Sequence, residues 1–173
     1  MDINVHEANL ELGVIGNGSF GALVDKRARV VWSCLPAFDG DPAFCALLSP
    51  CEQEGGDFSI ELEDFERSEQ RYDNNTAILR TTLHDSRGGS LEIVDFAPRW
   101  RQNGRLYRPV SIIRRITPLT GNPRIRVRLR PLADWGARVP ESTWGSNHMR
   151  WLLPHFTLRL STDVPVRFVR DGL

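Results

Sequence analysis

The chain has 173 residues, of which 40% are apolar and 25% are charged, a composition typical of a folded globular protein and not of a disordered one. Basic and acidic residues both number 22, so no net charge draws the chain to a polyanion such as nucleic acid. No apolar run approaches the ~20 residues of a membrane span, and the N-terminus lacks the basic-then-apolar order of a signal peptide, which predicts a protein that binds neither nucleic acid nor membrane.

Alternating apolar and polar residues dominate the chain from end to end. In residues 125–130, for example, Ile125, Val127 and Leu129 alternate with three arginines. This period of two predicts strands that rest one face on a core and turn the other to water. In chain order the predicted strands cover residues 20–25, 28–32, 58–63, 77–83, 91–96, 110–116, 125–130, 156–160 and 164–168.

Turn-forming residues separate these strands. Gly, Asn, Asp and Pro gather at residues 16–19, 73–75, 85–89 and 120–123. The only predicted helix is one or two turns long, with Asp41 as its N-cap and Pro42 in the first position. Short strands at this spacing predict an all-β fold, an antiparallel sandwich or barrel, and the lack of an interior linker predicts one domain over residues 1–173.

Motifs for metal or nucleotide binding are weak in this sequence. The histidines (His6, His84, His148, His155) have no metal-ligand spacing, so we expect no metal site. Gly16, Gly18 and Gly21 satisfy the bare pattern GxGxxG, but strands follow them where a dinucleotide site needs a helix. We therefore interpret these glycines as a tight turn and expect no cofactor.

No catalytic motif stands out either. Cys34 and Cys45 lie among apolar residues, which favours buried structural thiols over nucleophiles. With Cys51 the cysteines are odd in number and form no CxxC pair, which favours a reducing compartment, the cytoplasm. Carboxylates are plentiful, but nothing in the sequence marks one as a buried acid. The residues alone indicate a β domain without a visible active site.

One segment is richer in aromatic residues and cysteine than a simple connection: residues 30–48 read VVWSCLPAFDGDPAFCALL. With the preceding residues it resembles the N-terminal domain of bacterial and archaeal family 15 glycoside hydrolases, the glucoamylase, glucodextranase and trehalase-like enzymes. The matching positions are Ile15, Gly16, Asn17, Ala22, Leu23, Val24, Asp25, Trp32, Cys34, Pro36, Phe38, Asp39, Phe44, Leu47 and Leu48.

The resemblance continues in order along the chain. GGDFSI at residues 55–60, RYDNNTAILRTTL at 71–83, LEIVDFAP at 91–98 and RPVSIIRRITPLTGNPRIRVRLRPLADWG at 108–136 all look like family segments. Departures from the usual pattern are Ala28, Ala37, Gly40 and Trp135. These departures bear on the substrate more than on the fold.

The resemblance implies a large antiparallel β-sandwich of the super-sandwich type, truncated here at its C-terminal strands. In the family a following (α/α)6 domain carries two catalytic glutamates, and that domain is absent from this chain. The resemblance thus implies a non-catalytic module that packs on the barrel of a glucoamylase- or trehalase-like enzyme and shapes its pocket rim. The implied partners are the catalytic domain, an oligosaccharide at the domain interface, and a second copy through the exposed docking face.

The site residues that the resemblance suggests are Trp32, Pro36, Phe38 and Asp39, with no catalytic residue in this chain. Two roles remain open for them: filling a buried corner of the sandwich, or contacting the barrel and its sugar pocket. Two other functions also remain open. The tryptophans could stack on sugars in an independent carbohydrate-binding module, and a cysteine could serve a stand-alone enzyme. The tryptophans are Trp32, Trp100, Trp135, Trp144 and Trp151.

Overall fold

The computed structural model of the chain describes residues 10–48 and 55–170. Its largest sheet has the strand order β1-β2-β3-β5-β12, with β4 paired to the end of β3, and we call it the back sheet. Every pairing in it is antiparallel. Its strands are β1 (Gly13–Gly16), β2 (Gly21–Val24), β3 (Val30–Cys34), β4 (Pro42–Phe44), β5 (Asp57–Leu62) and β12 (Ile125–Arg130).

Two further sheets form the front layer, and all their pairings are antiparallel too. One has the order β11-β8-β7-β6 and the other the order β13-β14-β15. Their strands are β6 (Phe65–Tyr72), β7 (Leu79–Asp85), β8 (Ser90–Phe96), β11 (Ile113–Thr120), β13 (Glu141–Trp144), β14 (His148–Leu152) and β15 (Thr157–Ser161). The remaining elements are the hairpin β9 (Trp100–Gln102) and β10 (Arg105–Tyr107), the 3-10 turn η1 (Ala46–Leu48) and the helix α1 (Arg167–Arg170).

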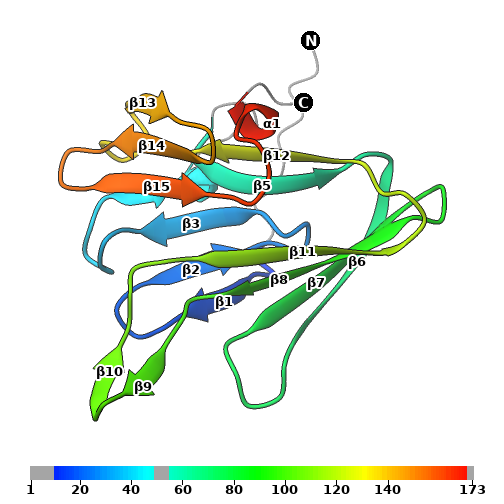
Figure 1. The fold of residues 1–173 in the computed structure, drawn as a ribbon, viewed down its shortest axis with the longest axis horizontal. Helices are drawn as coiled ribbons and strands as arrows, with labels where there is room; N and C mark the ends of the chain where they lie inside the picture. Colours follow the sequence, from blue (N-terminus) through cyan, green and yellow to red (C-terminus); the bar gives the residue numbers. More distant parts are fainter. Residues whose placement is uncertain (1–9, 49–54, 171–173) are drawn as a thin grey trace.

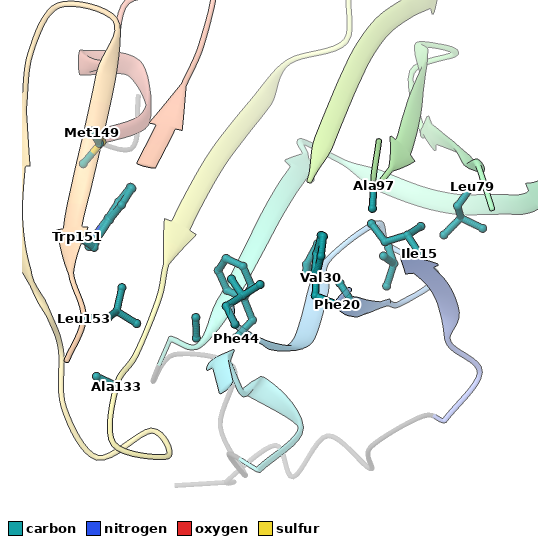
Figure 2. Packing of buried hydrophobic residues seen from close by; sticks show 14 of the residues in the cluster. Ile15, Phe20, Val30, Phe44, Leu79, Ala97, Ala133, Met149, Trp151 and Leu153 are labelled. Carbon is teal, nitrogen blue, oxygen red and sulfur yellow. The ribbon is translucent and has the colours of Figure 1, made fainter. Parts of the chain in front are cut away.

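The two layers enclose the core between them (Figures 1 and 2). Phe20, at the end of the β1–β2 turn, and Val30 of β3 share one cluster with Leu79 of β7 and Trp151 of β14. A second cluster joins β5 and β12 to β7, β8 and β11. Each large apolar side chain buried in this way contributes about 1.5–3 kcal/mol. The predicted all-β antiparallel sandwich is confirmed.

A buried ion pair lies on the core face of the front layer. Arg114 on β11 and Asp95 on β8 pair at 2.8 Å, with side chains 3% and 0% exposed. Arg114 also donates to the carbonyl oxygens of Phe58 and Ala28, and its guanidinium lies 4.6 Å from the Phe58 ring centroid. Because Phe58 and Ala28 belong to the back sheet and its β2–β3 turn, this arginine ties the two layers together.

Two local predictions were wrong in whole or in part. Asp41 does not start a helix: the chain forms β4 first and only then the single 3-10 turn η1, because the Asp41 carboxylate accepts backbone N–H groups of a distant loop and does not cap its own segment. Residues 164–168 do not form a strand: N–H of Phe168 bonds the Pro165 carbonyl and the chain enters α1. No helix in the described ranges is long and apolar enough to cross a membrane.

Candidate domain-contact surface

The corner after β3 presents most of the predicted site residues to solvent. The Leu35–Pro36 peptide bond is cis, and N–H of Gly40 donates to the Ala37 carbonyl at 3.0 Å to close a turn over residues 37–40. Leu35 is buried, whereas Phe38 is 64% exposed. Pro36 and Asp39 are exposed as well. The corner therefore anchors itself through Leu35 and turns three predicted residues outward.

Trp32 lies apart from that group. It sits within β3, where its side chain is half-buried. Phe38 instead covers Gly21 at the start of β2, so closely that a Cβ at that glycine would lie 3.1 Å from the ring. The structure thus brings Pro36, Phe38 and Asp39 together and leaves Trp32 on the sheet.

Asp41 fixes a second exposed aromatic residue next to this corner. Its carboxylate oxygens accept N–H from Asp134 at 2.6 Å and from Trp135 at 2.8 Å. Both of these residues have positive φ, 55° and 57°, which is uncommon outside glycine. The Asp41 bonds hold this loop in shape, and Trp135 projects from it with 63% of its surface exposed.

Asn17 clamps the base of the β9–β10 hairpin. This side chain is 3% exposed, and its amide donates to the carbonyl oxygens of Pro98 at 3.0 Å and Pro109 at 2.8 Å. Its own oxygen accepts N–H from Ser19. The predicted glycine turn at residues 16–19 therefore exists, and the asparagine inside it joins the two ends of an arm 81 and 92 residues away.

The arm itself is basic and aromatic. Trp100 and Tyr107 stack with ring centroids 5.4 Å apart and are 45% and 38% exposed. Asn103 and Gly104 turn the hairpin with φ of 50° and 72°. Four arginines and no carboxylate lie between residues 97 and 109. Sequence reasoning missed this element, although Asn-Gly between alternating residues is a strong hairpin signal.

These features gather at one end of the sandwich, which we call the loop end: the corner 35–41, the loop 133–138 that Asp41 holds, the turn 17–20 and the arm 98–109 (Figure 1). Gly21 touches the Phe38 ring, and a Cβ at Gly18 would lie 3.4 Å from an Arg108 nitrogen. Exposed aromatic rings beside arginines are typical of surfaces that contact another protein. The loop end is the candidate contact surface of this domain.

The described residues show few features of a catalytic site. Burial raises the pKa of the Cys34 and Cys45 thiols, and the Asp41 charge adds to this effect. Such thiols are poor nucleophiles at neutral pH. Within residues 10–48 and 55–170 no three His, Cys, Asp or Glu side chains gather to hold a metal ion. Cys51 lies outside the described residues.

The structure defines an all-β antiparallel sandwich whose loop end exposes aromatic and basic side chains. The sequence family described as trehalase-like, N-terminal, matches residues 7–146, and the chain belongs to that family.

One curated relative gives a particular protein for comparison. The chain is similar to Trehalase 2 of Sulfolobus acidocaldarius, with 34% identity over 89 residues, which is 51% of this chain and 14% of the relative. The chain therefore matches only a small part of that protein's length. No solved structure gave a significant match.

Proposed function

We propose that this chain is the non-catalytic N-terminal module of a family 15 glycoside hydrolase that cleaves α-glucosidic bonds, of glucoamylase or trehalase type. The match of residues 7–146 to the trehalase-like N-terminal family carries the proposal. The relative named as a trehalase supports it. The catalysis would belong to an (α/α)6 domain of the same parent protein.

The loop end is the surface that would pack on the catalytic domain. Phe38, Trp135 and the stacked Trp100–Tyr107 pair supply apolar area, and the arm supplies positive charge. Pro36 and Asp39 would lie at the rim of the sugar pocket, with an oligosaccharide bound at the domain interface. Trp32 would support the corner from within the sheet. We place the protein in the cytoplasm and assign it no cofactor.

An independent carbohydrate-binding module is the alternative. Exposed aromatic rings favour it, because Trp100, Trp135 and Trp144 could stack on sugar rings. Titrating the isolated chain with maltooligosaccharides and trehalose while following tryptophan fluorescence separates the two functions. A saturable change in fluorescence would favour the carbohydrate-binding module. No saturable change would favour the non-catalytic module of a hydrolase.

The direct test is turnover. The isolated chain is expected to release no glucose from trehalose or maltooligosaccharides, whereas the full parent protein should release it from at least one. Turnover by the isolated chain would contradict the proposal.

In the parent protein, Asp39→Ala should raise KM or lower kcat by about tenfold, the loss of roughly one charge-assisted hydrogen bond. The fold should persist, because Asp39 is exposed. Asp163→Ala, also exposed but on the connection after β15, is the matched control. If the Asp39 variant unfolded, Asp39 would have only a structural role in the corner and no role at the sugar pocket.

The exposed loop end also gives the isolated chain a route to self-association. Sedimentation at rising concentration should show weak dimers that Phe38→Ser reduces. A strictly monomeric chain would weaken the assignment of this surface.

A further inference from the structure

A pocket of about 380 Å³ lies at the end of the back sheet opposite the loop end. The β1–β2 turn belongs to the loop end, and the β2–β3 turn, which lines the pocket, closes the other ends of these strands. In the described part of the chain β3 bridges β5 at one pair, Val30 and Phe58, so β5 runs on beside the turn without β3 as its neighbour. The pocket lies at this gap, and its apolar lining includes Ile60, Leu62 and Leu83.

The pocket is lined by more positive than negative charge. Its basic side chains come from the β2–β3 turn and from β12, two segments far apart along the chain: Arg27, Arg29, Arg128 and Arg130. Two carboxylates of β5, Asp57 and Glu61, line it as well, so four positive charges stand against two negative ones. A guanidinium group binds phosphate and carboxylate oxygens through a planar fork of N–H donors. The excess of positive charge therefore favours a small oxyanion as the ligand.

Contacts within the protein hold the arginines of the turn in place. Arg29 donates Nε–H to the Asp25 carboxylate at 2.8 Å. The guanidinium of Arg27 lies 4.5 Å from the centroid of the Phe65 ring. Side chains that are already positioned lose less conformational entropy when a ligand binds. These two arginines are thus arranged beside the pocket before a ligand enters it.

One oxygen of the Asp57 carboxylate lacks a donor. Nε–H of Arg130 donates to Oδ1 at 2.9 Å, and Nη2 of the same arginine lies 2.9 Å from that oxygen too. Oδ2 has no hydrogen-bond partner within the described residues, although Asp57 is only 2% exposed. Folded proteins rarely leave a buried acceptor unsatisfied, because water no longer solvates it. Since Asp57 lines the pocket, a ligand bound there can supply the missing donor.

We propose that this pocket binds a small oxyanion that keeps a hydroxyl group, of which hydrogen phosphate is the simplest. Its oxygen atoms accept hydrogen bonds from the arginines, and its hydroxyl group donates to Oδ2 of Asp57. A neutral hydroxyl compound would leave the excess positive charge unmatched. The pocket lies away from the loop end, so this site does not depend on the proposed contact with a catalytic domain.

The hydroxyl group separates phosphate from similar anions. Asp57 carries its charge at pH 7, paired with Arg130, so an anion without a proton brings a second negative charge against Oδ2. Inorganic phosphate retains at least one proton at pH 7, whereas sulfate retains none. A phosphate monoester has a second pKa of about 6 and has mostly lost this proton. Free phosphate should thus bind more tightly than sulfate or a phosphate monoester.

Isothermal titration calorimetry of the 173-residue chain tests the proposal at pH 7 and constant ionic strength. The ligands are inorganic phosphate, sulfate and methyl phosphate. We expect one phosphate site and binding of the other two anions that is weaker by about tenfold or more, because each lacks the donor for Oδ2. Arg27→Gln should weaken phosphate binding about tenfold. Arg150→Gln, at an exposed position on β14, is the matched control and should bind phosphate as the unsubstituted chain does.

Asp57→Asn should remove the preference for a hydroxyl group. The amide keeps an oxygen for Arg130 and places an N–H donor where Oδ2 stood, so it neither repels sulfate nor needs a proton from the ligand. We expect the affinities for phosphate and sulfate to become equal within about threefold. A residue that only supports the fold would change both affinities by the same factor, so their ratio identifies a direct contact.

Three results would overturn the proposal. Binding of none of the three anions would show that the pocket takes no oxyanion. Equal binding of phosphate and sulfate by the unsubstituted chain would show that Asp57 receives no hydrogen bond from the ligand. Phosphate binding that Arg27→Gln leaves unchanged would place the anion elsewhere on the protein. The first two results need no substitution, so they decide the matter even where Asp57→Asn does not fold, and no measurement here depends on sugar hydrolysis.

Discussion

Asp57 on β5 is a carboxylate enclosed by the protein. It is 2% exposed, and Arg130 donates Nε–H to its Oδ1 at 2.9 Å. Its Oδ2 has no hydrogen-bond partner in the described part of the chain. Burial raises the pKa of Asp57, and the nearby Arg130 charge opposes this without cancelling it. Nothing in the sequence marked this acid as buried, because its neighbours on the outer face of the strand are polar.

The raised pKa makes a prediction about stability against pH. The folded chain holds this proton more tightly than the unfolded chain, so the contribution of Asp57 to the free energy of unfolding falls as pH rises from the ordinary pKa of 3.8 through the raised value. Asp57→Asn keeps an acceptor for Arg130 and removes the titration. We expect the variant to be more stable than the unsubstituted chain at pH 7, because it no longer carries a buried charge at this position.

Urea unfolding at a series of pH values measures this difference. The control variant Asp163→Asn, at an exposed position, should have the same free energy of unfolding as the unsubstituted chain at every pH. If the variant were less stable than the unsubstituted chain at pH 7, and its free energy of unfolding changed with pH in the same way, the attraction of Arg130 would outweigh the effect of burial.

The β9–β10 hairpin shows how one element depends on another far along the chain. A lone two-stranded hairpin is marginal in water, and this one exposes Trp100, Leu106 and Tyr107. The Asn17 clamp at its base and the stacked ring pair hold it. The arm is thus positioned by the β1–β2 turn rather than by its own strands.

Asn17→Ala should therefore release the arm. The two carbonyl oxygens of Pro98 and Pro109 lose their donors, which costs about 1–3 kcal/mol. Trypsin should cut at Arg101 or Arg105 several-fold faster, while the far-UV spectrum stays that of a β protein. Asn74→Ala, in an exposed turn, is the control. Equal cleavage rates in the two variants would show that the clamp does not hold the arm.

At the scale of the whole molecule, Arg114, held by Asp95, makes a deeply buried polar contact between the two layers. Most of the interface between the layers is apolar, and such packing tolerates sliding more than a fixed set of hydrogen bonds does. Arg114 reaches from the front layer to carbonyl oxygens of the back sheet. The pair therefore specifies how the sheets sit on each other.

Asp95→Ala leaves the Arg114 charge buried without its partner, and we expect a loss of about 3–5 kcal/mol in the free energy of unfolding. Glu61→Ala removes a more exposed partner, paired with Arg128 at 3.2 Å, and should cost at most about 1 kcal/mol. Chemical denaturation of both variants makes the comparison. Similar losses for the two would mean that the buried pair adds nothing beyond a surface pair.

Local pattern predicted most strands and the turns between them. The alternation in residues 125–130 is confirmed as β12, and the glycine turn at residues 16–19 joins β1 to β2. The pattern failed where a distant partner decided the outcome. Asp41 looks like a helix cap from its neighbours, but it bonds Trp135, which lies 94 residues away. Residues 164–168 alternate like a strand, but Pro165 starts a turn into α1.

The sequence by itself determined the class of this protein: an all-β chain of short strands that carries the motifs of the trehalase-like N-terminal family. Side-chain periodicity and turn residues depend on residues close together in the sequence, so they can be predicted without a structure. The tertiary structure decided that Pro36, Phe38 and Asp39 share an exposed corner while Trp32 does not, that Asn17 holds an arm, and that arginines of the β2–β3 turn and of β12 line one pocket. Those facts depend on contacts between residues far apart along the chain, which only the folded backbone brings together.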